Sequence, residues 1–359
     1  MSTAPCTMAD VARRVGVHPA TVSRALRNDP RITPAQRENV QRIAAEMGYR
    51  KNALVAALMS VRRARRAPAY QATLAFVTRY PAGRAHFFRS EFGQLLAGAR
   101  GRALAQGYRI EEFNVHDPDL SAARSTEILL SRGVRGVIVA PLHSIHEPVV
   151  LDWAPFSAVA IGYSLQGVAI SRVSHHHFNG LTVAARECRA AGRTRLGLVV
   201  PRRVHEKVQK RWLAALLLDQ AEHPGPPVPP LLLEEWTEAE FATWFGRHRP
   251  DAVLCINASV VQDWLLRLGR PARDVALISL DWRTRDRGIA GIEQDYPQMG
   301  AAAVDTVIGM LHRNEQGPPP KPLTLLLDGT WIPGRPLRPL TAPAPAARWP
   351  RPRRAPAPA

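Results

Sequence analysis

Two short amphipathic stretches open the chain and predict helices separated by a tight turn. The first, over residues 8–14, follows Thr7, with Asp10 three residues after that threonine. At this spacing the two side chains can cap the free N–H groups of a helix start. Gly16 predicts the turn, and Pro19 suits the first turn of a second helix. We therefore expect a helix, a turn and a second helix within the first 26 residues.

A third helix is predicted immediately afterwards. Thr33, Pro34 and Gln36 supply an N-cap, a first-turn proline and a capping-box partner. The apolar residues that follow recur with helical spacing on one face, and Gly48 is a typical stop signal. Residues 1–50 thus read as a three-helix head.

The next stretch, residues 51–70, differs from a packed domain. Asn52 can cap a brief apolar helix over residues 53–59, and a run of arginines over 62–66 follows. This segment is too short to bury its apolar face alone. We interpret it as a hinge helix followed by a basic linker.

From residue 73 onward, short β-rich runs alternate with amphipathic helical stretches. The predicted strands are 74–77, 109–113, 134–140, 158–161, 195–200, 252–256 and 275–280. Such alternation predicts parallel sheets with crossover helices. About seven strands over about 260 residues fit two doubly wound lobes better than one oversized sheet, because single cores stop growing near that length.

Proline-rich segments mark the remaining connections. Residues 224–230 read as an internal loop and 317–322 as a connection, while the Pro-, Ala- and Arg-rich tail after Gly334 has a disordered composition. The predicted organisation has four parts: the head (1–50), the hinge and linker (51–70), the two-lobed core (71–333) and the tail (334–359).

The charge is concentrated at the two ends of the chain. The formal net charge is +18; residues 1–70 carry 13 Lys and Arg against 4 Asp and Glu, and residues 334–359 carry 6 arginines and no acid. A basic head and hinge point to an acidic partner such as nucleic acid.

Cysteines and hydropathy bear on the compartment. Cys6, Cys188 and Cys255 are an odd number spread along the chain, unlike the dense pairing of secreted disulfide scaffolds. The sequence shows no secretory signal pattern and no run of about 18 apolar residues that would span a membrane. We expect a soluble cytoplasmic protein.

The head resembles a known family. Residues MADVARRVGVHPATVSRALRNDPRITPAQRENVQRIAAEMGYRKNALVAAL, from Met8 to Leu58, resemble the DNA-binding head of the lactose and galactose repressor family. The runs VARRVGV, ATVSRAL, ITPAQRENV and MGYRKNAL occur together at the family's spacing, which is far more specific than any one of them. The resemblance implies a helix-turn-helix whose second helix lies in the major groove of DNA.

The resemblance assigns base contacts to the second helix. Pro19 and Ala20 fall where the family reads bases and offer apolar contact, for instance to a thymine methyl group. Arg24 falls on the family's arginine one turn later, and its guanidinium can bond a guanine in a bidentate manner. A phosphate contact by Arg24 is the alternative.

The other predicted DNA contacts of the head are polar. Thr21 and Ser23 are expected to bind phosphate, and Thr7 at the start of the first helix is a further candidate. His18 replaces the serine that usually precedes the second helix, which we expect to weaken its N-cap.

The hinge carries three further candidates, Asn52, Val55 and Leu58. Leu58 stands at the position of the family's leucine lever, which wedges between base pairs in the minor groove and kinks the duplex. The alternative is a plain helical linker in which Leu58 packs internally.

The core resembles the family more weakly, in GVRGVIVAPL, PDAVLCINAS and VALISLDW followed by GIEQDYPQMGAAAV. In the family this core is a periplasmic-binding-protein-like pair of lobes around a small effector, often a sugar. Asn257, Asp281 and Gln294 match the family's cleft residues, all after strand ends, where open α/β sheets place ligands. Trp282 could stack on a sugar face. The alternative is a set of solvated loop-end side chains.

Two positions depart from the family's effector-binding pattern. Val208 stands where the family has an effector-binding arginine four residues before the aromatic residue Trp212, and His176 and His177 replace the usual Asp-Asn pair. The run His175 to His177 lacks the accompanying Cys or carboxylate cluster of a metal site, so we expect no metal.

Two more residues follow strand ends in the first lobe. Arg79 and His143 are further candidates for the effector cleft.

Catalytic motifs are missing from the sequence. No GxxxxGK[ST], GxSxG, HExxH, CxxC or GxGxxG occurs, so the sequence favours a regulator without a cofactor over an enzyme. The prediction is a homodimeric transcription regulator, with a repressor favoured, that binds a palindromic operator and responds to a small molecule, with a sugar favoured. Three alternatives stay open: a ligand-independent DNA-binding regulator, a sugar-binding protein and a sugar-processing protein.

Overall fold

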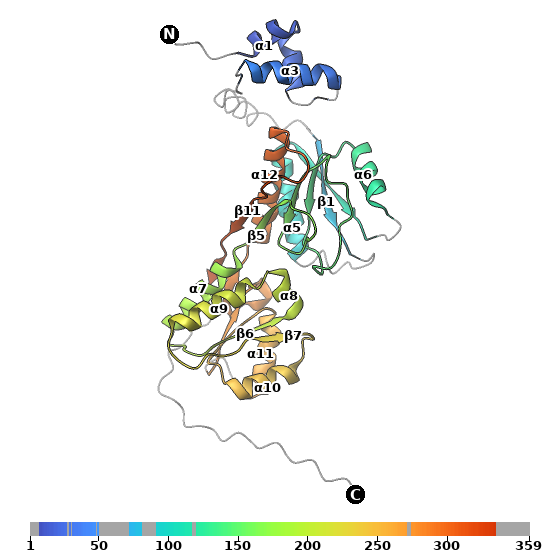
Figure 1. Ribbon diagram of the computed structural model, residues 1–359. Coiled ribbons are helices and arrows are strands. Elements are labelled where there is room, and N and C mark those ends of the chain that lie inside the picture. Colours follow the sequence, from blue (N-terminus) through green and yellow to red (C-terminus); the bar gives the residue numbers. More distant parts are fainter. Residues whose placement is uncertain are drawn as a thin grey trace, which may run out of the picture. The chain divides into compact units, whose positions relative to one another are not determined.

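The computed structural model describes residues 7–26, 29, 31–47, 49, 72–80, 91–116, 120–270 and 274–334 (Figure 1). The described residues form three parts: the head (7–49), lobe 1 (72–174 with 296–326) and lobe 2 (175–295 with 327–334). Asn52, Val55 and Leu58, predicted to contact DNA, lie outside the described residues.

The head contains the three predicted helices, α1 (Met8–Val15), α2 (Pro19–Ala25) and α3 (Pro34–Glu46). Thr7 caps α1 as expected: its Oγ1 accepts from the Asp10 N–H at 3.3 Å, and the Asp10 carboxylate accepts from the Thr7 N–H at 2.8 Å. Gly16 ends α1 with φ of 76°, a left-handed conformation that glycine adopts without strain. The helices bury a small apolar core of Val11, Ala12, Val22, Ala25, Ile32, Val40 and Ala44.

Lobe 1 is a six-stranded sheet in the order β11-β5-β4-β3-β1-β2. Its strands are β1 (Ala72–Thr78), β2 (Tyr108–Asn114), β3 (Gly136–Val139), β4 (Ser157–Ile161), β5 (Ser171–His175) and β11 (Thr324–Leu327). The helices that pack on it are α5 (Glu91–Ala105), α6 (Ala122–Ser131) and α12 (Tyr296–Arg313). β1 to β5 pair in parallel, as the alternating pattern predicted. α5 and α6 connect β1 to β2 and β2 to β3, whereas the connections from β3 to β4 and from β4 to β5 contain no helix.

Lobe 2 repeats the plan in the order β12-β10-β9-β8-β6-β7. Its strands are β6 (Leu196–Pro201), β7 (Leu231–Leu233), β8 (Ala252–Cys255), β9 (Ala276–Ser279), β10 (Ala290–Glu293) and β12 (Thr330–Ile332). Its helices are α7 (His177–Ala190), α8 (Arg202–Lys207), α9 (Arg211–Glu222), α10 (Glu238–His248), α11 (Ala258–Arg267) and the 3-10 turn η2 (Thr284–Asp286). Only β12, antiparallel to β10, departs from parallel pairing among the pairs described in this sheet.

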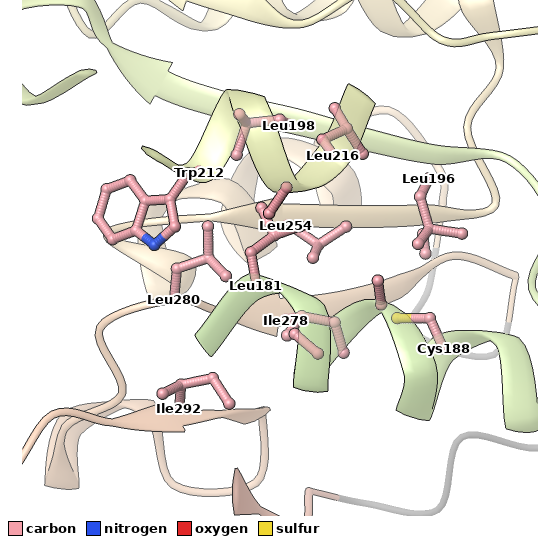
Figure 2. Packing of buried hydrophobic residues seen from close by; sticks show 14 of the residues in the cluster. Leu181, Cys188, Leu196, Leu198, Trp212, Leu216, Leu254, Ile278, Leu280 and Ile292 are labelled. Atoms are coloured by element: carbon pink, nitrogen blue, oxygen red, sulfur yellow. The ribbon is translucent and has the colours of Figure 1, made fainter. Parts of the chain in front are cut away.

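Alternation of side chains along the strands divides the lobe 2 core between the two faces of the sheet. Leu196, Leu198, Leu254 and Ile278 pack with α7 and α9 on one face (Figure 2). The residues between them, such as Val253, pack with α10 and α11 on the other face. Both faces are covered, which is why the sequence reads here as apolar runs rather than alternating ones.

The predicted strand count was too low, although all seven predicted strands form. β5, β7, β10, β11 and β12 were missed. β5 reads SRVSH and β10 reads AGIE, so neither carries an apolar run of its own, while β7 and β12 have three residues each. β5 and β10 are buried by neighbours distant in sequence, whereas β11 is largely exposed and β12 is partly exposed. The loop at 224–230 and the connection at 317–322 contain no helix or strand, as predicted.

The two strand orders place a topological switch in each lobe. In lobe 1, β1 lies between β2 and β3, so the next two strands of the chain are added on opposite sides of β1. In lobe 2, β6 lies between β7 and β8 in the same way. In open parallel sheets, ligands bind at the carboxyl ends of the strands beside such a switch.

None of the described helices is long and apolar enough to cross a membrane.

Candidate nucleic-acid interface and ligand site

Helix α2 is capped by an imidazole. His18 is its N-cap residue, and the His18 Nδ1 accepts a hydrogen bond from the Ala20 N–H at 3.2 Å, with Pro19 in the first turn. Histidine therefore supplies an N-cap acceptor, because an unprotonated ring nitrogen accepts the bond that a serine hydroxyl usually accepts, and the expected weakening of this cap stays a prediction.

The same helix separates buried from exposed residues by its periodicity. Val22 and Ala25 lie in the core of the head and are fully buried. Side chains predicted to contact DNA lie on the other faces: His18, Pro19, Ala20 and Arg24 are exposed, and Thr21 and Ser23 are half-buried. Thr7, at the start of α1, is also exposed. The first turn of α2 therefore presents a solvent-facing surface that can enter a groove.

The segment after α2 is held by local bonds. The Gln41 Nε2 donates to the Ala25 carbonyl at 3.2 Å, which fixes the end of α2 against α3. Asp29 binds the Arg31 guanidinium through both carboxylate oxygens, at 2.9 and 2.7 Å, and also accepts from the Arg31 N–H. These hydrogen bonds hold the pKa of the Asp29 carboxyl well below its usual range.

In lobe 1, the two sequence candidates follow the strands at the switch. Arg79 comes directly after β1, and its Nη1 donates to the Val115 carbonyl at 3.2 Å. His143 follows β3 in an exposed loop. The fold thus places both at the carboxyl ends of adjacent strands.

In lobe 2, Asn257, Asp281 and Gln294 follow β8, β9 and β10, so they lie at the carboxyl ends of three neighbouring strands. The structure adds two residues that the sequence analysis missed. Arg283 forms an ion pair with Asp281, and the side chains are 17% and 14% exposed. The Arg285 Nη2 donates to the Asn257 Oδ1 at 3.1 Å. We call Asn257, Asp281, Trp282, Arg283, Arg285 and Gln294 the strand-end cluster.

Two members of this cluster bond to backbone rather than to solvent. The Trp282 indole N–H donates to the Ile289 carbonyl at 3.0 Å. Gln294 is 5% exposed, and its Nε2 donates to the Leu280 carbonyl at 2.9 Å. Both side chains therefore fix the strand ends, and the amide of Gln294 is largely withdrawn from any ligand.

A buried carboxylate shapes the turn that carries the two arginines. Asp286, at 1% exposure, accepts from the Ser279 Oγ at 3.0 Å and from the Arg283 N–H at 3.2 Å. This holds the segment after β9 against the end of that strand. The signal in the sequence is weak, because Asp286 is five residues from Asp281 and lies in no recognised motif.

The departures noted in the sequence have structural counterparts. Val208 is buried in the apolar cluster of lobe 2, so this position offers no charge to a ligand. Trp212 is buried in the same cluster, and its ring lies 5.1 Å from the ring of His177 in an edge-on arrangement. His177 lies equally close to His175, and burial lowers the pKa of both histidines, to about 4 for His175.

The third histidine of the run has a different environment. The His176 Nδ1 lies 2.9 Å from the Asp328 Oδ1, which also accepts from the Asn179 Nδ2 at 2.8 Å. Among the residues that the structure describes, no group of three or more His, Cys, Asp or Glu side chains could hold a metal ion.

Two family models match the chain. The model of bacterial regulatory proteins of the lacI family matches residues 7–52, and that of the periplasmic binding protein-like domain matches residues 185–335. Together they cover the head, most of lobe 2 and the last helix of lobe 1, more than half of the chain. The chain belongs to the lacI family of bacterial regulatory proteins.

Solved structures share the fold of this lacI-family protein. The transcriptional regulator CelR in complex with cellobiose matches at a TM-score of 0.56 and 19% identity, over 91% of this chain and 98% of that one. The lac repressor dimer bound to operator and the anti-inducer ONPF matches at 0.53 and 18% identity, over 93% and 100%.

A third solved structure shares the fold over a smaller part of this chain. The lacI-family regulator CCPA from Weissella paramesenteroides with bound glucose matches at a TM-score of 0.54 and 14% identity, over 76% of this chain and 100% of that one. At these identities the likeness establishes the fold alone. A search among curated proteins returns no match.

Proposed function

We propose that this lacI-family protein is a sequence-specific DNA-binding transcription regulator, a repressor that binds a palindromic operator as a homodimer and responds to a small molecule. The observation that carries the proposal is the exposed face of α2, with Pro19 and Ala20 outward in its first turn, Arg24 outward in its last turn, and Val22 in the core. A second helix displayed in this way is the element that helix-turn-helix proteins insert into the major groove.

The proposed dimer rests on the small number of base-reading side chains in one head. One head offers few side chains that reach base edges, and each good bidentate contact contributes about 1–3 kcal/mol of discrimination. Two heads on half-sites about one helical turn apart double the contacts and read a palindrome. The operator-bound lac repressor dimer, which shares the fold, supports this assembly.

The hinge completes the DNA-binding surface in this proposal. Asn52 and Val55 contact DNA, and Leu58 wedges into the minor groove, where the kink that it stabilises depends on the sequence being deformed. Leu58→Ala should weaken operator binding by roughly 1–3 kcal/mol and leave nonspecific binding nearly unchanged.

The core serves as the sensor. Arg79 and His143 in lobe 1 and the strand-end cluster in lobe 2 lie at the carboxyl ends of the strands, where open sheets bind small molecules. Neighbours of this fold contain cellobiose and glucose, which supports a sugar-like effector. An effector acts by binding two arrangements of the protein unequally, so ligand response and DNA binding should be separable by mutation. No cofactor and no catalytic step belong to this proposal.

A second candidate, a ligand-independent regulator, is favoured by one observation. Asp281, the residue expected to grip ligand hydroxyls, is already paired with Arg283. A thermal-shift screen of sugars, sugar acids and sugar phosphates separates the two candidates, because a ligand that binds only the folded protein raises its apparent stability.

Selection of operator sequences from random DNA tests the proposed DNA binding. The protein should enrich a palindrome, bind it with a steep dependence on salt, and lose preference at one base pair per half-site in the Arg24→Ala variant. Arg42→Ala is the matched control, since Arg42 is an exposed arginine on α3 paired with Glu46. Enrichment of no sequence would refute the proposal, and equal losses on all sequences would assign Arg24 to a phosphate contact.

A further inference from the structure

The strand-end cluster differs from a site built to grip neutral hydroxyls. In such a site, carboxylate and amide groups face the ligand with their hydrogen-bonding atoms available. Here the Asp281 carboxylate bonds Arg283, the Asn257 Oδ1 accepts from Arg285, and the Gln294 Nε2 donates to a backbone carbonyl. Each of these three side chains therefore already bonds within the chain through a polar atom that could otherwise bond a ligand hydroxyl.

The turn after β9 orients its charges in opposite directions. Asp286 is 1% exposed and bonds inward to Ser279, so its charge lies beneath the turn. Arg285, on the same turn, is exposed. The solvent-facing side of this turn therefore presents guanidinium groups, and the carboxylates beside them are either buried or paired.

Arg285 also lies at the carboxyl ends of the strands, where the effector site is proposed. Its bond of 3.1 Å to Asn257 spans from the turn after β9 to the end of β8, the strand beside the topological switch. This contact uses one N–H of a guanidinium that carries five in a rigid planar fork. The Asn257 side chain, which accepts through its oxygen, keeps its amide N–H groups as further donors.

We propose that lobe 2 binds an acidic effector, a small molecule carrying a carboxylate or phosphate group, through Arg285, with Arg283 holding the Asp281 carboxylate neutralised. The inference rests on the proposed effector site and specifies its ligand class. Planar or tetrahedral oxyanions match the guanidinium fork in a bidentate manner. An unpaired Asp281 would repel such an anion, and its ion pair with Arg283 removes that repulsion.

The experiment uses the full-length protein and matched pairs of probes at constant ionic strength. Glucose is compared with gluconate, glucuronate and glucose 6-phosphate, and galactose with its corresponding acids and phosphate. Sodium sulfate serves as a simple-anion control. The two readouts are the shift in unfolding midpoint and the change in affinity for the selected operator.

At least one acidic probe should stabilise the protein and change operator affinity while its neutral partner and sulfate do not. The carboxylate and phosphate probes together identify which oxyanion the site takes. Arg285→Gln should weaken binding of that probe at least tenfold. Arg287→Gln is the matched control, because it removes the same charge from an exposed arginine two residues away that has no described hydrogen bond to Asn257 or Asp281.

A pair of variants tests the role assigned to Arg283. Arg283→Gln leaves Asp281 uncompensated and should weaken the acidic probe strongly, whereas Arg283→Gln combined with Asp281→Asn should recover part of the binding. A cooperative unfolding transition of the Arg283→Gln variant, measured separately, shows that it is folded and that its loss of binding reflects charge.

The remaining outcomes overturn the inference. These are equal binding of neutral partners, equal losses in the Arg285→Gln and Arg287→Gln variants, or no response to any probe. If neutral sugars release the operator, or if operator binding is intact and nothing changes it, the proposed DNA-binding function stands and only the ligand class fails. If no operator is found, the proposed function fails, and the thermal shifts still decide between acidic and neutral ligands.

Discussion

The head and lobe 2 present their candidate residues in opposite ways. In the head, α2 displays Pro19, Ala20 and Arg24 outward from a small apolar core. In lobe 2, the candidates are engaged by their own chain, as Asp281 is by Arg283 and Gln294 by the Leu280 carbonyl. A surface that reads DNA needs side chains exposed on a rigid helix. A small-molecule site needs side chains whose positions are fixed by bonds within the protein before the ligand binds.

This difference predicts different failures. A substitution on the exposed face of α2 should change DNA recognition and leave stability nearly intact. A substitution in the core should change stability, ligand response or both, and leave the head folded.

Gly98→Ala should destabilise the core by about 3 kcal/mol. A Cβ at Gly98 in α5 would lie 2.0 Å from the Pro297 carbonyl oxygen of α12, which forces two closely packed helices apart. Gly101→Ala is the matched control on the same helix, where a Cβ meets no atom within 4 Å and alanine should stabilise the helix by up to about 1 kcal/mol. Denaturant unfolding of both variants measures the difference, and equal stabilities would contradict the packing described for lobe 1.

Lobe 2 should lose stability in mild acid. Burial lowers the pKa of His175 to about 4, below the ordinary value of 6.5, so the unfolded chain takes up a proton before the folded lobe does. Stability should be full above pH 6.5 and fall as the pH drops toward 4, by up to about 3 kcal/mol from a pKa difference of this size.

Tryptophan fluorescence during urea unfolding between pH 7.5 and 4.5 measures this loss. His177, whose pKa is also lowered by burial, should add to it in the same direction. The His175→Gln variant should show a flatter pH dependence than the parent protein. An unchanged pH dependence would show that His175 does not titrate in this window.

Asp281→Ala should cost about 1–2 kcal/mol of stability, because it leaves the half-buried Arg283 without its ion-pair partner. It should change the ligand response, because Asp281 and Arg283 belong to the strand-end cluster, while operator affinity in the absence of ligand stays unchanged. The double variant Asp281→Ala, Arg283→Ala should regain stability, as expected for a directly coupled pair. Loss of operator affinity in the single variant would break the separation between core and head.

His18→Ala should have the smallest effect on stability, about 1 kcal/mol within the head, because it removes the side-chain bond to the Ala20 N–H. His18→Ser restores an N-cap acceptor and should be close to neutral. Hydrogen exchange of amides in α1 to α3 reports this locally. Equal exchange in the alanine and serine variants would show that the imidazole does not cap the helix.

The sequence predicted the head more accurately than the core for a physical reason. Caps such as Thr7 with Asp10 and the first-turn Pro19 act over three or four residues, so the signal and the structure that it produces are adjacent. β5 and β10 were missed because their burial depends on neighbouring strands and helices rather than on their own composition.

The same contrast holds for the candidate sites. The position of Asp281 after a strand is visible in the sequence, and the fold places it as expected at the carboxyl edge of the sheet. Its pairing with Arg283 was not predictable, since it depends on a turn held by the buried Asp286 through Ser279. Local patterns locate a residue, but its partners are set by tertiary contacts.

The most direct test of the central claim measures operator binding by the parent protein and by the Arg24→Ala variant across a set of single-base operator changes and salt concentrations. The parent protein should discriminate at the base pair read by Arg24, and the variant should lose about 1–3 kcal/mol of discrimination there and nowhere else. A parent protein that binds all sequences with the same affinity at every salt concentration would contradict the assignment of α2 as a DNA-reading helix.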